Sequence, residues 1–451
     1  MKNLLKLAFL LCSVALTASI VSNQPASAQS ATPTPVPTLV TVSADGKSGG
    51  NNNVGLGVAV SRNGRYVVFE AVGTNLTPNP NGATLYVRDL QAGITKAVDV
   101  SYNGTKTNNF STSGPSISAD GRYIVFSSYA SNLVPNDTNG LPDIFVRDMT
   151  TGTTKLVSVL PSGAQFNGRS IQPFISGDGS SIVFRTSATN WTTNDKIGRS
   201  EGVLFCSNPF IRNSDFSNLA VYNGYGGNAA SWPTSISYNG AYVTIVSLAT
   251  NFCDRDGNGS PDVFLSSSGG LTLVDYSVDS SGNIVTPQFG ASEGVVSDDG
   301  RYVCFYSQSS AITTTTPYTI VSGGTNVFLR DMQVGTTVVS RPLNNAAANS
   351  ISAHPTMSGD GRYIVFYSEA SNLVPNDTNN QADLFVFDRQ NPTSVKKTIY
   401  LGPHGDEYFG DPLQNHPYIS GDGTIVIFPT SQQLNSIPTG VYCNEYAVPR
   451  P

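Results

Sequence analysis

The chain has 451 residues and a formal net charge of −6, and only 12% of its residues are charged. Binding of duplex nucleic acid depends on clustered Lys and Arg, so this composition argues against a nucleic-acid partner. The 43 glycines, 27 prolines, 20 tyrosines and 21 phenylalanines suit short strands joined by turns better than charged helices.

Residues 1–28 have the features of a secretory signal peptide. Two early lysines are followed by a short apolar run over 4–16 and by the small-x-small pattern of Ala26-Ser27-Ala28. The run is too short for a membrane anchor, and no later segment has 18 consecutive apolar residues. We therefore expect an exported protein, periplasmic or extracellular, without membrane insertion. Residues 29–37, rich in Thr and Pro, are expected to form an extended lead-in.

From residue 38 onward the chain repeats a unit of about sixty residues. Each copy places Asp-Gly or Asn-Gly between two β-rich runs, as in SADGRYIVF, and these dipeptides favour a two-residue hairpin turn. The turn glycines are Gly64, Gly121, Gly179, Gly240, Gly300, Gly361 and Gly423. Most copies carry a second pair of strands downstream, for example 143–148 and 155–159. The repeat thus predicts four antiparallel strands, a to d, with a long b–c loop.

Seven such sheets predict an all-β, seven-bladed β-propeller, because a four-stranded sheet covers its faces only by stacking against its neighbours. The sequence of segment 38–43 matches that of the expected strand d at 154–159. The last repeat, by contrast, ends after an expected strand c at 441–443 and lacks a strand d of its own. We therefore expect the N-terminal strand to pair in the last blade and close the ring. The expected propeller covers 38–446, followed by a tail at 447–451.

The hairpin S-x-D-G-R-Y-[IV]-[VA]-F followed by D-[IL]-[FY]-V-x-D resembles the WD40-like (PD40) repeat of TolB-like propellers. The resemblance extends over residues 38–446 and implies the propeller fold. It says little about activity, because propellers host many unrelated functions.

Several b–c loops, which share a face with the d–a loops in this fold, are rich in oxygen ligands. Blade four reads DRDGNGSPD over 254–262, similar to the start of a D-x-D-x-N-G calcium loop, although Leu265 stands where an EF-hand has its closing Glu. Shorter versions occur in blades two and six. The predicted calcium ligands are Asp254, Asp256, Asn258 and Asp262, then Asp137, Asn139 and Asp143, then Asp377, Asn379 and Asp383. The alternative is that these side chains brace tight turns.

His354 and His416 hold equivalent positions before a proline, near the start of strand a and so near the axis of the ring. Two neutral imidazoles in adjacent blades can bind a transition metal. The placement resembles that in the oligogalacturonate lyase family, which implies His354 and His416 as ligands, with His404 and Gln414 as further ones. The equivalent residues elsewhere are Gly114, Gln172 and Trp232, so a variable residue before proline is the alternative.

Four cysteines follow the signal peptide: Cys206, Cys253, Cys304 and Cys443. They allow three disulfide pairings, and the sequence selects none of them. Cys304 lies in an apolar run, which favours a buried free thiol.

No catalytic residue is predicted, because the G-x-S-x-G match at 290–294 lacks the strand-turn-helix context of a nucleophile elbow. We expect a non-catalytic propeller that binds protein or glycan through its b–c and d–a loop face, with calcium as the stabilising ion. The alternative is a metal-dependent polysaccharide lyase with its metal at His354 and His416.

Overall fold

The computed structural model describes residues 36–450 apart from 79–80, 161, 191–201, 208, 210, 212–226, 253–257, 279–280, 282, 310, 313–323, 343–346, 376, 378–381, 393–395, 398–415, 431–433 and 440–442. Strands and turns make up this described part, which contains no helix. It therefore contains no helix long and apolar enough to span a membrane.

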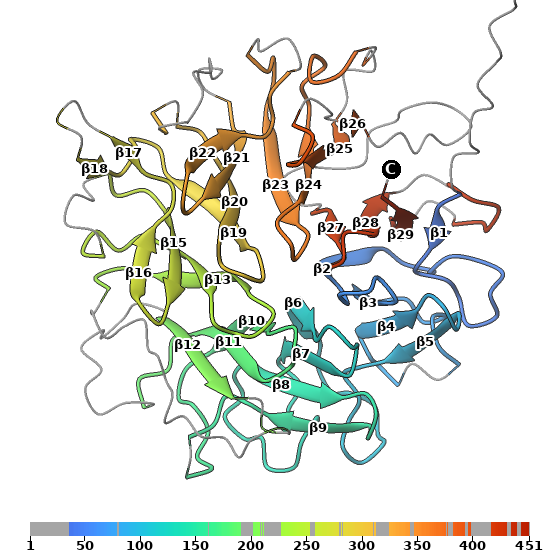
Figure 1. The fold of residues 1–451 in the computed structure, drawn as a ribbon. Helices are drawn as coiled ribbons and strands as arrows, with labels where there is room; N and C mark the ends of the chain where they lie inside the picture. The colour runs from blue at the N-terminus through green and yellow to red at the C-terminus, as the bar shows by residue number, and fades with distance from the viewer. Residues whose placement is uncertain are drawn as a thin grey trace, which may run out of the picture. The chain divides into compact units, whose positions relative to one another are not determined.

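Seven antiparallel sheets follow one another around a common axis, each counted from the inner strand outward (Figure 1). Blade one is β2 (Val54–Val60), β3 (Tyr66–Ala71), β4 (Leu85–Asp89) and β5 (Ile94–Ala97). Blade two is β6 (Ser111–Ile117), β7 (Tyr123–Ser128), β8 (Asp143–Asp148) and β9 (Thr153–Leu156). Blade three has three described strands, β10 (Ser170–Ile175), β11 (Ser181–Thr186) and β12 (Gly202–Ser207). Blade four is β13 (Ser231–Ile236), β14 (Val243–Ser247), β15 (Asp262–Ser267) and β16 (Gly270–Leu273).

A small hairpin, β17 (Ser277–Val278) and β18 (Ile284–Val285), precedes blade five. Blade five is β19 (Ala291–Val296), β20 (Tyr302–Ser307), β21 (Asn326–Asp331) and β22 (Gly335–Val338). Blade six is β23 (Ser352–Met357), β24 (Tyr363–Ser368), β25 (Asp383–Asp388) and β26 (Lys396–Lys397). Blade seven is β27 (Tyr418–Ile419), β28 (Ile425–Thr430), β29 (Asn444–Pro449) and β1 (Thr38–Leu39). The seven-bladed, all-β fold predicted from the repeat is confirmed.

The N-terminal strand closes the ring as predicted. Strand β1 pairs antiparallel with β29, with Thr38 opposite Ala447 and Leu39 opposite Tyr446, and the two strands lie side by side in Figure 1. The prediction placed the last strand too early, because β29 covers residues 444–449 and so extends into the expected tail. Ala447 and Val448 are buried in the core, which explains why pairing continues past residue 446.

The core is built from the apolar residues of the hairpin motif, packed between neighbouring blades. The final Phe of the motif is fully buried at Phe69, Phe126, Phe184, Phe305 and Phe366. In most of these blades it stacks on an aromatic ring of strand c, as Phe126 does on Phe145 with centroids 5.8 Å apart. Each buried ring contributes about 1.5–3 kcal/mol of apolar burial, so the repeated motif contributes to core stability in each of these blades.

The a–b turns meet near the axis on one face of the propeller. The backbone N–H of Asp298 donates to the carbonyl of Gly359, whose own N–H donates to the carbonyl of Gly421, both at 2.8 Å. The Arg62 guanidinium forms an ion pair with Asp298 and lies 5.0 Å from the ring centre of Tyr238. Contacts between turns thus tie together blades that are distant in sequence.

The opposite ends of the inner strands carry the d–a and b–c loops, which are fastened to each other. In five blades an Asn before strand a donates its side-chain N–H to a Ser or Thr after strand b, at 2.8–2.9 Å. These residues are Asn51, Asn108, Asn167, Asn228 and Asn349. The expectation that the two loop types share a face is therefore confirmed.

Candidate metal site at the propeller axis

Three adjacent blades bring potential metal-ligand side chains together near the axis. Glu293 lies on β19, His354 on β23, and His416 stands two residues before β27. One potential ligand atom from each residue lies within 4.8 Å of the others. Each residue precedes the turn glycine of its own hairpin by the same interval, so adjacent blades present them at the same level.

The backbone turns the side chains of Glu293 and His354 inward. Strands β19 and β23 each have a register shift, between Ser292 and Val295 and between Ala353 and Thr356. Within these bulges Glu293 has a φ of 55° and His354 a φ of 53°. Left-handed backbone is uncommon for residues other than glycine, and bulges redirect side chains, so the bulge explains how strand a points both residues toward the axis.

The three side chains contact one another directly. His354 Nδ1 lies 3.0 Å from Glu293 Oε1 and 2.9 Å from Oε2. His416 Nδ1 lies 3.7 Å from Glu293 Oε2, and the two imidazole centroids are 4.1 Å apart. The carboxylate therefore lies within reach of both rings.

Burial differs among the three residues. The His354 side chain is only 4% exposed, whereas 28% of Glu293 and 35% of His416 remain exposed, so solvent reaches the site. The buried Nε2 of His354 has no hydrogen-bond partner among the described residues, and a buried polar atom left in this state is costly. Partial burial lowers the pKa of His416. The Glu293 carboxylate raises this pKa and nearby His354 lowers it, and the net shift is downward. A neutral His416 keeps a lone pair available for a metal.

Two imidazoles and one carboxylate form a donor set suited to divalent transition metals. The unpartnered Nε2 of His354 supports this fit, because a metal would satisfy an atom that the described protein groups leave unsatisfied. Tyr306 lines the site with its ring centroid 5.7 Å from that of His354, and burial raises its pKa to about 12. Tyr306 therefore stays protonated near neutral pH.

His354 and His416 lie together as predicted from the sequence. The other two residues implied by the lyase resemblance, His404 and Gln414, lie outside the described residues. Sequence reasoning missed Glu293, although a signal was present. Glu293 stands at the same interval before Gly300 as His354 stands before Gly361.

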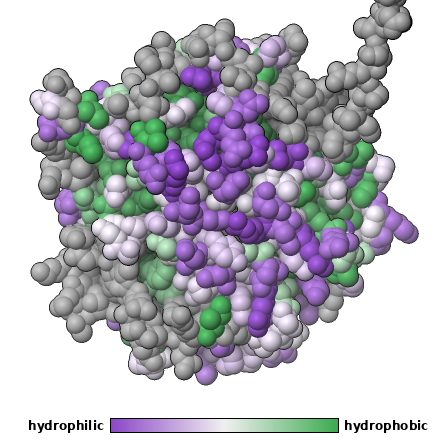
Figure 2. Space-filling view, in the orientation of Figure 1, coloured by the Kyte–Doolittle hydropathy of each residue, from purple (hydrophilic) through white to green (hydrophobic). Residues whose placement is uncertain are grey.

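The same inner ring continues with different side chains in blades three and four. Gln172 has a φ of 53° within its bulge and accepts a hydrogen bond from Arg185 Nη1 at 3.2 Å. The Arg185 guanidinium lies 5.4 Å from the ring centre of Trp232. In the view of Figure 2, hydrophilic side chains gather across the middle of the propeller.

The predicted calcium loop of blade two uses its side chains as turn braces. Asn139 donates its side-chain N–H to Asp143 Oδ2 at 2.8 Å, while its Oδ1 accepts the N–H of Leu141. Asp137 accepts a hydrogen bond from Gln165 at 3.1 Å. Burial raises the pKa of Asp143 to about 6. These contacts are those expected from the bracing alternative.

Blade four repeats the brace in the part that is described. Asn258 donates to Asp262 Oδ1 at 3.2 Å, and its Oδ1 accepts the N–H of Ser260. Asp254 and Asp256, with Asn379 of blade six, lie outside the described residues. Asp377 and Asp383 of blade six are buried. Calcium binding by these loops stays a prediction.

The described cysteines, Cys206, Cys304 and Cys443, are free thiols, and Cys253 lies outside the described residues. Cys304 is fully buried, as its apolar run predicted. Burial raises the pKa of Cys206 to about 12, so this thiol is unreactive near neutral pH.

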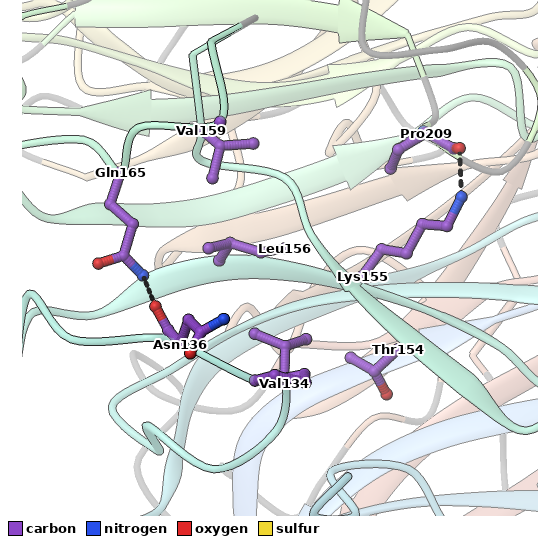
Figure 3. Close-up of a pocket in the computed structure, with 10 residues that line it drawn as sticks. Val134, Asn136, Thr154, Lys155, Leu156, Val159, Gln165 and Pro209 are labelled. Carbon is purple, nitrogen blue, oxygen red and sulfur yellow. Dashed lines mark hydrogen bonds between the residues drawn. The ribbon is translucent and has the colours of Figure 1, made fainter.

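A separate cavity of about 640 Å³ lies at the outer strand of blade two (Figure 3). Leu156 and Val159 contribute its apolar lining, and Asn136 and Gln165 contribute polar groups. Lys155 extends along it and donates to the carbonyl of Pro209 at 2.7 Å. Because β9 is the outermost strand of its blade, this cavity is distinct from the metal-ligand cluster on the inner strands.

No protein-family model matches the sequence, and no curated protein matches it. Among solved structures, an oligogalacturonate lyase in complex with manganese is similar at 13% identity and a TM-score of 0.51, over 92% of this chain and 97% of that chain. TolB from Acinetobacter baumannii is similar at 15% identity and a TM-score of 0.37, over 67% of this chain and 56% of that chain. A putative TolB from Agrobacterium tumefaciens is similar at 14% identity and a TM-score of 0.38, over 88% and 90%.

This chain thus spans just over half the length of the first TolB structure. The seven antiparallel blades confirm the propeller predicted from the TolB-like repeat, and at this identity the likeness to the lyase concerns the fold alone.

Proposed function

We propose that this propeller is an exported binding protein that holds a divalent transition-metal ion at Glu293, His354 and His416 and presents it to a ligand. The observation that carries the proposal is the convergence of one carboxylate and two imidazoles within 4.8 Å. The Nδ1 atoms of His354 and His416 lie 2.9 Å and 3.7 Å from Glu293 Oε2, which supports the proposal because both donors already face the carboxylate.

The donor atoms of the site also suit a bound cation. The rings of His354 and His416 are 4.1 Å apart between centroids, and the Nδ1 of each lies within 3.7 Å of a Glu293 carboxylate oxygen. A cation there would be met by one negative charge and by imidazole lone pairs. Three protein ligands leave coordination positions open, which oxygen atoms of a ligand can occupy.

The role proposed for the metal is to anchor a ligand. A metal-dependent polysaccharide lyase would use the same three residues, so the test has to separate binding from turnover. Glu293 and His416 are partly exposed, so a bound ligand or a substrate could reach the site.

The purified protein, stripped of metal, is titrated with Mn²⁺, Ni²⁺, Zn²⁺ and Ca²⁺ by calorimetry, and bound metal is counted by mass spectrometry. We expect about one transition-metal ion per chain and a rise in Tm on loading. His354→Ala and His416→Ala should both lose the ion. Gln172→Ala, which changes the same bulge position in blade three, is the matched control and should retain it.

Equal metal binding by the wild type and His354→Ala would refute the proposal, as would a wild type that binds no transition metal. Metal-dependent release of unsaturated products from an acidic polysaccharide would mean that the site catalyses cleavage and does not only anchor a ligand.

A further inference from the structure

Two exposed aromatic side chains contact each other at the loop end of blade two. Phe110 is 54% exposed and Tyr129 is 40% exposed. Their ring centroids are 5.4 Å apart, with the ring planes inclined at 51°. Exposed aromatic surface of this kind gains nothing from the core, so a role outside folding has to be considered.

The backbone under both rings is fixed by the blade. Phe110 directly precedes β6 and Tyr129 directly follows β7. The Tyr129 N–H and the Ser128 hydroxyl both donate to the Phe110 carbonyl at 3.2 Å. The Phe110 N–H donates to Asn109 Oδ1 at 3.0 Å. A ligand binding here would therefore meet two rings that are already held in place.

The other blades show that the fold needs this backbone bond but does not need the aromatic rings. The same bond joins residue pairs that are not aromatic, at 2.9–3.0 Å. These pairs are Ser187 with Arg169, Leu248 with Ala230, and Glu369 with Ile351. Blade two alone among these four places two aromatic residues at the positions, so the pair is a feature of this blade and not of the repeat.

The surroundings of the pair indicate the chemistry of its ligand. Residues 108–111 and 128–132 contain no charged side chain and are rich in Asn and Ser. Asn108 Nδ2 donates to Ser131 Oγ at 2.9 Å, the loop-fastening bond that recurs in other blades, and Asn132 Nδ2 donates to the Lys106 carbonyl at 2.9 Å, so the polar side chains beside the rings are uncharged. A sugar ring offers an apolar C–H face for an aromatic ring and carries uncharged hydroxyls, which suit uncharged surroundings. A charged peptide would find no opposite charge in these two segments.

We propose that Phe110 and Tyr129 form a stacking platform for a pyranose ring of a neutral glycan. The platform lies on blade two, whereas the metal-ligand residues come from blades five to seven. This inference therefore does not depend on the metal site.

The test is a glycan array probed with the purified protein, followed by calorimetry with the neutral oligosaccharide that binds best. We expect Phe110→Ala and Tyr129→Ala each to weaken binding about tenfold, which corresponds to about 1.4 kcal/mol. Tyr129→Phe keeps the ring and should retain most of the affinity. Phe289→Ala removes an equally exposed phenylalanine, 51% exposed, before the first strand of blade five and should leave affinity unchanged.

The variants truncate exposed side chains, so their Tm should match that of the wild type, and their metal stoichiometry should be unaffected. Wild-type protein that binds no neutral glycan would overturn the proposal. So would equal affinity in the Phe110→Ala/Tyr129→Ala double variant, or aromatic-dependent binding of peptides in place of sugars. Loss of self-association in the double variant, without any glycan effect, would reassign the platform to a contact between two copies.

Discussion

We expect Glu445 to make the stability of the propeller depend on pH. It lies on β29, the strand that receives the N-terminal strand, and its side chain is 1% exposed. Burial raises its pKa from 4.5 to about 8. Between these two values the folded protein keeps a proton that the unfolded chain releases, so the free energy of unfolding falls as the pH rises through this window. We expect the loss to be about 3 kcal/mol at pH 7 and at most about 5 kcal/mol well above pH 8.

Glu445→Gln removes the titration and keeps the shape of the side chain. The backbone N–H of Glu445, which donates to Thr41 Oγ1 at 3.3 Å, is unaffected by the change. We expect the variant to match the wild type at about pH 4.5 and to be more stable by about 3 kcal/mol at about pH 7, with a further gain above that. Urea unfolding at several pH values between these limits measures the difference directly.

Glu369→Gln is the control, because Glu369 is an exposed carboxylate whose replacement should leave the pH dependence of the wild type intact. Parallel pH profiles for Glu445→Gln and the wild type would refute the reasoning, since they would mean that the buried carboxyl titrates alike in the folded and unfolded chains.

Two further predictions concern the turn and the ring closure. Gly121→Ala should lower the free energy of unfolding by more than about 1 kcal/mol, because Gly121 has a φ of 77° and a Cβ there would lie 2.2 Å from Tyr66 Cδ2. Gly104→Ala is the control, because Gly104 has a similar φ of 75° and a Cβ there would have no atom within 4 Å. The difference between the urea midpoints of the two variants therefore measures the clash with Tyr66, and equal midpoints would contradict the prediction. Leu39→Ala should lower the free energy of unfolding by about 2–5 kcal/mol, because Leu39 is buried in the strand that closes the ring. The exposed Ile94→Ala is its control in a thermal melt, and a similar Tm for the two variants would mean that the closing strand contributes little.

The fold was predictable from the sequence because its main signals are local. Each Asp-Gly or Asn-Gly turn and the alternation beside it specify a hairpin without reference to the rest of the chain. The last strand was misplaced because its signal is not local. Asn444 and Glu445 are polar, and the sequence does not indicate that they are buried. Asn444 accepts a hydrogen bond from Thr41, 403 residues away in the chain, and only the closed ring brings the two together.

The candidate metal-ligand cluster was only partly predictable for a related reason. His354 and His416 stand out because the chain has only 3 histidines. Glu293 does not stand out among 31 acidic residues, and no proline follows it. Its position beside His354 depends on a bulge and on the contact between blades five and six, which become visible only when the strands are aligned in space.

The repeat itself indicates where function is to be sought. At the bulge of strand a, Gly114, Gln172, Glu293 and His354 share a positive φ in four blades. Their side chains differ although this backbone conformation is the same, so the conformation does not determine the side chain. The same reasoning applies to Phe110 and Tyr129, whose backbone bond recurs in other blades without the rings. In a propeller of this kind, positions with a repeated backbone and an unrepeated side chain are therefore where binding chemistry can be added at little cost to the fold.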